Sequence, residues 1–350
     1  MNNILTSIPQ ILQKQGFGGP NQGLLHGNMG ISIFLYHLSR ATGNPEPEEM
    51  ADQLLDKVFA SLTTQASTDF EHGLAGIGWG IEYLLQNGFA DGNADEILDE
   101  VDTKVYRTLT HENLPNNFEF TNGLTGYLWF LNSRLKNKTD TRAMTYRINR
   151  ELLIHLINHL DVVVTEQFPA IVKELSFDLF WKFPAVLQGI MDSYRLNIFN
   201  HKIEMMVKQW HMYFEAYIPS LHINRIYMAW VIHRLNQLFP SKKLERQVQV
   251  LLFATCFEEM GTEYDPNHAE LRLGWPSALW VLKQALKSLP PGSPNFKEIE
   301  TYAATLALTG RAKLENLFAT QAETQKPLNP GINSGITGMG LMELLYPGIS

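Results

Sequence analysis

The sequence predicts an all-α fold of seven helical hairpins, and two observations carry this prediction. First, a polar residue followed by Gly-x-x-Gly and an apolar helical run recurs along the chain, at a spacing of about 50 residues that suits one hairpin. Second, the stretches between the copies place apolar residues at helical spacing and contain little of the alternation typical of strands. Because two glycines three apart lie on one helix face, another backbone or a ligand is expected to come close there.

Four copies of the motif are plain, one is eroded and two are degenerate. The eroded copy begins at Gly274, and the two degenerate copies have Lys182 and Arg225 at the glycine position. The pattern therefore predicts seven units and about 14 helices. The plain copies read His26-Gly27-Asn28-Met29-Gly30, His72-Gly73-Leu74-Ala75-Gly76, Asn122-Gly123-Leu124-Thr125-Gly126 and Ser334-Gly335-Ile336-Thr337-Gly338.

Each unit is expected to contain a second helix, as in residues 50–59 and 146–160, where apolar residues recur on one face. The loops between helices are rich in Gly, Pro and Asn, and none is long enough to link separate domains, so residues 1–350 are expected to form a single domain. Stacked hairpins form an open solenoid or a closed ring. The motif at Gly335 is nearly as good as the first and neither end has a polar capping repeat, which favours closure.

Charge and composition exclude several classes of partner and location. The chain has a net charge of −8 with acidic and basic residues interspersed, so a nucleic-acid partner is not expected. It has no apolar run long enough for a membrane span and no signal peptide in residues 1–15. Cys256 is the only cysteine, which rules out an internal disulfide and fits a reducing, cytoplasmic compartment.

The glycine motifs, the sevenfold count and the length together resemble the lanthionine synthetase C-like (cyclase) family over essentially the whole chain. His26-Gly27, His72-Gly73 and residues 333–340 form a distinctive set in this order. The resemblance implies an α/α toroid, or barrel, with an inner ring of seven helices and the motif turns around a central cavity. Family enzymes add cysteine thiols of a precursor peptide to dehydroalanine or dehydrobutyrine, with zinc holding the thiolate.

The chain departs from this family at the zinc ligands, which are a Cys ahead of the fifth motif and a Cys-His pair ahead of the sixth. Here residues 221–225 contain no cysteine, and Arg272 and Leu273 occupy the Cys-His positions. The family's histidine ahead of the fourth motif is also missing, since Trp181 precedes Lys182. Zinc catalysis needs three protein ligands and an open fourth position. We therefore expect no zinc or other cofactor, and a pseudoenzyme that binds a peptide or peptide intermediate in its cavity.

Glu119 and His72 are the candidate catalytic residues. The resemblance implies an acidic residue four places ahead of the third glycine motif, and Glu119 stands there, with Asp69 in the same position of the second unit. His26 and His72 precede the first glycine of their units, and a histidine with a pKa of about 6.5 can act as acid, base or ligand. Capping of the helix N-terminus is the favoured alternative, because Asn122 and Ser334 fill the same position with good capping residues.

The candidate ligand-binding residues are His26, Asp69, Asn122, Lys182, Arg225, Arg272 and Trp275. The three cations stand in the degenerate units and are costly to bury unpaired, so they either form a cationic cluster facing the cavity or meet carboxylates. Trp275 belongs to an aromatic group in the same units, for which core filling is the default and peptide or sugar binding the alternative.

Two other functions stay open at this level. α/α toroids also host glycoside hydrolases, which use two carboxylates, and the candidates are Asp69, Glu71, Glu119, Asp178 and Glu263. A pure interaction scaffold is the other, with the cavity filled by side chains. The expected partners are a peptide or small molecule and peptide-modifying enzymes.

Overall fold

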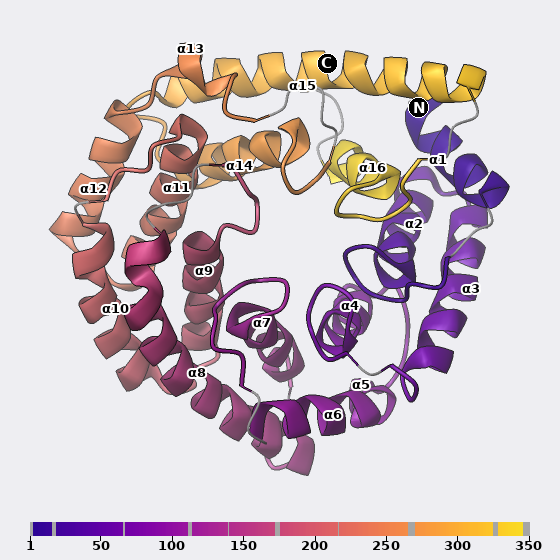
Figure 1. Cartoon of the computed structure of the whole chain (residues 1–350), viewed down its shortest axis with the longest axis horizontal. Helices are drawn as coiled ribbons and strands as arrows, with labels where there is room; N and C mark the ends of the chain where they lie inside the picture. The colour runs from indigo at the N-terminus through magenta and orange to yellow at the C-terminus, as the bar shows by residue number, and fades with distance from the viewer. Residues whose placement is uncertain are drawn as a thin grey trace. The chain divides into compact units, whose positions relative to one another are not determined.

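The computed structural model describes residues 3–15, 19–65, 67–110, 114–138, 140–171, 176–215, 217–264, 270–324 and 328–345. Within these ranges every regular element is a helix, labelled α1 to α16 in Figure 1, and no strand occurs. None of the helices described combines the length and the apolar character that crossing a membrane requires.

The chain divides into two compact units. Unit 1 comprises residues 1–159 and 317–348, and unit 2 comprises residues 160–316 and 349–350. The four plain glycine motifs all lie in unit 1, whereas the three eroded or degenerate motifs all lie in unit 2. The boundary between the two units therefore separates the plain glycine motifs from the eroded and degenerate ones.

Unit 1 contains a row of four motif helices with further helices packed behind it. In this row α16 (Ile336–Leu345), α2 (Asn28–Thr42), α4 (Leu74–Gln86) and α7 (Leu124–Leu135) each contact the next. Behind them, α1 (Asn3–Lys14) packs on α16, α3 (Glu46–Ser61) on α2, and α5 (Ala94–Ile97) and α6 (Asp99–Thr110) on α4. Two long helices, α8 (Met144–Ile171) and α15 (Phe296–Thr324), have residues in both units.

Unit 2 repeats this arrangement with three motif helices. Its row consists of α9 (Lys182–Arg195), α11 (His222–Leu238) and α14 (Trp275–Ser288), in which α11 contacts the other two. Behind the row, α10 (Asn200–Phe214) packs on α9, while α12 (Lys242–Phe253) and α13 (Phe257–Met260) pack on α11. Each of the seven motifs therefore lies at the start of a row helix.

The plain motifs need glycine because the preceding loop folds back over the helix N-terminus. In all four copies, the N–H after the first glycine donates to the carbonyl oxygen seven residues earlier, at 2.9 to 3.0 Å. In the first three copies, a Cβ at the second glycine would lie within 3.0 Å of a loop carbonyl oxygen, which no side chain tolerates. The facing pairs are Gly30 with Leu24, Gly76 with Phe70 and Gly126 with Phe120.

Large aromatic side chains fill the core of unit 2, which agrees with the default expectation for them. Trp181, Trp210 and Trp230 are at most 2% exposed. The Trp275 ring, 4% exposed, packs so closely on Gly310 of α15 that a Cβ there would overlap it. Trp275 is therefore a core residue, as the default expectation for these aromatic side chains has it, and almost none of its surface is exposed to a ligand.

Candidate functional site

The loops before the four row helices of unit 1 are joined to one another by backbone hydrogen bonds. Asn333 N donates to Leu25 O (2.8 Å), Leu25 N to Glu71 O (3.1 Å) and Glu71 N to Thr121 O (3.1 Å). All of these residues stand two places before the first glycine of their motif. These bonds align the loops, so the residue directly before the first glycine lies in the equivalent place in each of them.

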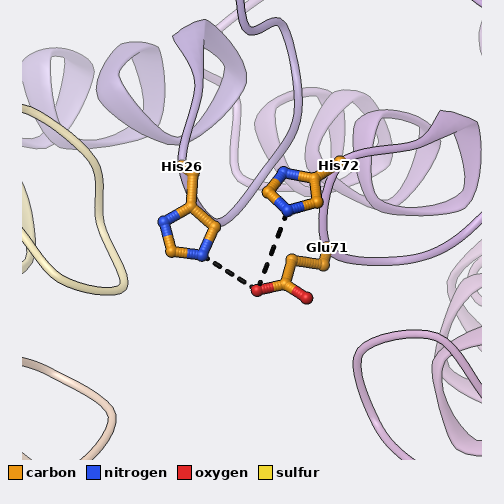
Figure 2. Close-up of side chains that lie close together, drawn as sticks. All are labelled: His26, Glu71 and His72. Atoms are coloured by element: carbon orange, nitrogen blue, oxygen red, sulfur yellow. Dashed lines mark hydrogen bonds and ion pairs between the residues drawn. The ribbon is translucent and has the colours of Figure 1, made fainter.

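This arrangement places His26 beside His72 and joins both to Glu71. His26 Nε2 lies 2.9 Å from Glu71 Oε1, and His72 Nε2 lies 4.0 Å from the same oxygen. The two imidazole rings stack with centroids 5.1 Å apart and planes inclined by 29°. Figure 2 shows both rings directed at one carboxylate oxygen. We call these three residues the His–Glu–His cluster.

The cluster is open to solvent on the His72 side. The exposed fractions of the side chains are 24% for His26, 21% for Glu71 and 50% for His72. The groups are therefore held by protein contacts while one face stays reachable. Imidazole and carboxylate at this exposure can accept a proton, donate one, or bind a cation.

Polar residues around the cluster set the positions of its protons. Asn21 Oδ1 accepts from Gly23 N (2.9 Å), so the Asn21 amide presents its NH₂ to His72 Nδ1 at 3.3 Å. The neutral His72 ring consequently keeps its lone pair on Nδ1 and its proton on Nε2, which faces Glu71. His26 Nδ1 lies 3.4 Å from Ser334 Oγ, a hydroxyl that can donate or accept.

The expected capping role of His26 and His72 is wrong. The N-cap residues of α2 and α4 are Gly27 and Gly73, and neither helix has a side-chain cap. The first free N–H groups are instead taken by carbonyl oxygens of the folded-back loops. Because loop carbonyl oxygens cap these helices, the imidazoles of His26 and His72 are not needed as caps and can form the cluster.

The other site candidates of unit 1 lie in the same set of loops. Asp69 Oδ1 accepts from the His72 backbone N–H (2.7 Å), so Asp69 holds the loop that carries His72. Glu119 is partly buried in the loop before α7, and its N–H donates to Asn117 Oδ1 (2.9 Å). Asn122, in the position of His26 and His72, is exposed. The carboxylate of the cluster is thus Glu71, not the Glu119 or Asp69 expected from the sequence.

The cationic candidates of unit 2 have separate partners. Arg272 forms an ion pair with Asp178 through two guanidinium nitrogens, with Nε 2.9 Å and Nη2 2.7 Å from Asp178 Oδ2. Arg225 donates to Pro219 O (2.8 Å) and Ser220 O (3.0 Å), which fastens the loop before α11. Lys182 is the partly buried first residue of α9. For Arg225 and Arg272, structural contacts within unit 2 thus replace the expected cationic cluster facing a ligand.

The residues at the family's zinc position do not fit the metal. Arg272 is paired with Asp178, and Leu273, which is 41% exposed, has no donor atom. At the start of α11, in the fifth motif, His222 Nδ1 accepts from Cys256 N (3.0 Å) and His222 Nε2 faces Glu259 Oε2 (3.0 Å). Since both nitrogens of His222 are occupied, the position lacks the three ligands that catalytic zinc requires.

The glycosidase hypothesis also loses most of its carboxylates. Asp178 is paired with Arg272, and Glu263 accepts from the N–H groups of His222 (2.7 Å) and Ile223 (2.9 Å) at the start of α11. Asp69 is bound to the His72 backbone. Three of the five candidates therefore have structural roles.

Sequence reasoning missed the role of Glu71 and the asparagines that shape the loops. Glu71 directly precedes a motif histidine, but the sequence placed it only among the glycosidase carboxylates. A second signal is an asparagine or serine six places before the first glycine. In three copies its side-chain oxygen accepts the N–H two residues later at 2.9 Å, a turn that asparagine favours. The copies are Asn21, Ser67, Asn117 and Asn329, of which the asparagines make this bond.

Comparisons with known proteins bear on the family and the fold. Residues 20–169 match the sequence model of the lanthionine synthetase C-like protein family. Among solved structures, nisin cyclase is 14% identical, with a TM-score of 0.62 over 98% of this chain and 93% of that chain. No curated protein sequence matches significantly.

The likeness to nisin cyclase confirms the predicted fold class, an all-α fold of the α/α toroid type. The family match covers the first three motifs, and the shared fold extends over nearly the whole chain. Over residues 20–169 this chain is therefore similar to the lanthionine synthetase C-like family, and over nearly its whole length it shares the fold of nisin cyclase.

Proposed function

We propose that this protein takes part in peptide modification by binding a peptide or a peptide-modification intermediate, without the zinc-dependent catalysis of the family's cyclases. The match of residues 20–169 to the lanthionine synthetase C-like family and the fold shared with nisin cyclase support a peptide ligand. The single observation that carries the loss of cyclase chemistry is the Arg272–Asp178 pair. It fills a zinc-ligand position with a cation whose guanidinium is already neutralised.

We place peptide binding at the loops before the row helices of unit 1, in the cavity expected from the sequence. The His–Glu–His cluster is the polar centre of these loops, and its exposed His72 side is accessible to a ligand. The loops are fixed by repeated backbone hydrogen bonds, so little ordering is needed on binding. Peptide-modifying enzymes are the proposed partners, and a cytoplasmic location is part of the proposal.

Fluorescence anisotropy with a labelled peptide that contains both dehydroalanine and cysteine tests this function. With chelator present, we expect wild-type protein to bind the peptide, and His72→Ala and Glu71→Gln to bind it more weakly. His201→Ala, which removes an exposed histidine of unit 2, is the matched control and should bind like wild type. Absence of binding, or equal binding by all variants, would contradict the proposed site.

A second measurement tests the loss of cyclase chemistry. After incubation with the protein, the peptide is treated with a thiol-alkylating reagent and its mass is measured by mass spectrometry. Addition of the thiol to dehydroalanine leaves the mass unchanged but removes the free thiol, so only unreacted peptide is alkylated. We expect full alkylation. Thiol loss that depends on catalytic amounts of protein would show an active cyclase.

A further inference from the structure

We propose that His26, Glu71 and His72 bind a divalent transition metal ion, at a site separate from the family's zinc position. The donor set is two imidazole nitrogens and one carboxylate oxygen, a combination that suits zinc and its neighbours. Among the His, Cys, Asp and Glu side chains of the described residues, these three form the one group of three or more whose ligand atoms all lie within 4.8 Å of one another. The inference revises the expectation that the chain needs no metal.

Two of the three distances between ligand atoms lie near the value for a metal site, and all three are at most 4.8 Å. Zinc binds nitrogen and oxygen at about 2.0–2.2 Å, so the ligand atoms of a tetrahedral site lie about 3.3 Å apart. The 2.9 Å between His26 Nε2 and Glu71 Oε1 and the 4.0 Å between His72 Nε2 and Glu71 Oε1 lie on either side of this value. Three protein ligands leave a fourth position open on the exposed His72 side.

The charge of the cluster also favours a cation. Two neutral imidazoles and one carboxylate carry a net charge of −1. Glu71 is partly buried, and its ion-pair partners among the described residues are the two histidines and no lysine or arginine. A divalent ion would supply the positive charge that this carboxylate otherwise receives only when a histidine is protonated.

The loops hold the ligands before any metal arrives. Leu25 N donates to Glu71 O (3.1 Å), and Asp69 Oδ1 accepts from His72 N (2.7 Å), so the backbone on both sides of the cluster is fixed. Gly23 packs directly on His72, since a Cβ at Gly23 would lie 2.6 Å from His72 Cα. Ligands held in this way need little reorganisation on binding.

Asn21 gives the proposal a test of its own. Metal binding at His72 Nε2 moves the ring proton to Nδ1, where the Asn21 NH₂ group now faces it. In Asn21→Asp, one carboxylate oxygen would keep the bond to Gly23 N, and the other would accept the proton on Nδ1. A carboxylate partner of this kind fixes the metal-binding tautomer and strengthens the ligand, and such contacts change metal affinity by about 10- to 100-fold.

Titration of the chelator-stripped, full-length protein with Zn²⁺ and Co²⁺ tests the site by calorimetry and by the absorption of bound Co²⁺. We expect one ion per chain, affinity at least about 10-fold weaker in His26→Ala, Glu71→Gln and His72→Ala, and affinity about 10-fold tighter in Asn21→Asp. His201→Ala, an exposed histidine outside the cluster, should match wild type.

Two results would overturn the metal site. One is absence of binding by wild-type protein, and the other is binding that survives in all three cluster variants. If the alanine variants fail to fold, Asn21→Asp decides alone, because unchanged or weaker affinity in that variant contradicts the assigned geometry. Peptide binding is measured with chelator present, so failure of the metal site and failure of the proposed function are separate results.

Discussion

The N–H of Leu25 donates to the carbonyl oxygen of Glu71 at 3.1 Å, and this bond joins the loops of the first two motifs. His26 follows Leu25 and His72 follows Glu71, so one backbone contact between the loops brings both imidazoles to the same carboxylate. The glycine motif therefore does more than let helices pack. It shapes loops that can place side chains from separate repeats at one point.

Replacing Gly76 with alanine should lower the free energy of unfolding by about 1–3 kcal/mol, because the new methyl group would overlap Phe70 O. The urea midpoint, followed by circular dichroism, measures the change. Gly292→Ala is the control, since a Cβ at Gly292 would meet no atom within 4 Å. Equal midpoints for the two variants would mean that the close contact at Gly76 is not needed.

Arg134 should be one of the most sensitive polar residues of unit 1. Its side chain is fully buried and paired with Glu82, Asp95 and Asp102. Arg134→Met leaves Asp102 without its cation and leaves Glu82 and Asp95 with Lys138 alone, and breaking a buried pair typically costs about 3–5 kcal/mol. Arg195→Met removes an exposed pair with Asp192 and should cost less than about 1 kcal/mol. Thermal unfolding of both variants compares the two, and similar losses would contradict the role given to Arg134.

The same group of charges should make stability depend on pH in acid. Partial burial raises the pKa of Asp95, but the hydrogen bond and charge of Lys138 and the charge of Arg134 outweigh this and hold the pKa below its usual value. The folded state therefore binds fewer protons than the unfolded state. The stabilisation is present above the unfolded pKa of about 3.9 and is lost as pH falls through the lower folded value.

Asp95→Asn removes this titration and should flatten the dependence. Urea midpoints between neutral pH and about pH 3, for wild type and Asp95→Asn, measure the difference in slope. Asp99→Asn, in the first turn of α6, is the control for removal of a nearby carboxylate. Parallel curves for wild type and Asp95→Asn would mean that Asp95 is not held by its cations.

The fold was predictable because its evidence is repeated along the sequence. Seven motifs at a regular spacing locate seven row helices, even where Lys182 and Arg225 replace the glycine. The helix behind each motif follows from apolar periodicity, which local sequence carries. The extra short helices α5 and α13 lack such a repeat and were not expected.

The candidate site was only partly predictable, because its contacts join residues of different repeats. His26 and His72 were recognised from their place in the motif, but capping was favoured since sequence does not show which groups satisfy the helix N-terminus. Glu71 enters the site through the bond between loops, and its place directly before His72 does not show that it also reaches His26. Likewise, Arg272 was expected to face a ligand because it stands in the ligand position of the resembled family. Its partner, Asp178, is 94 residues away in sequence, so the sequence did not show the pair.

Arg272 should contribute to stability and not to ligand binding. Its guanidinium is paired with Asp178, and its carbonyl oxygen accepts from Leu179 N (3.0 Å), so side chain and backbone both join the loops before α9 and α14. We expect Arg272→Met to lower the melting temperature, whereas its affinity for the labelled peptide stays at the wild-type value. Asp178→Asn should lower the melting temperature by a similar amount, and the double variant should add little, since both substitutions break one pair. Weaker peptide binding by Arg272→Met, at a temperature where the variant is folded, would return Arg272 to the ligand site.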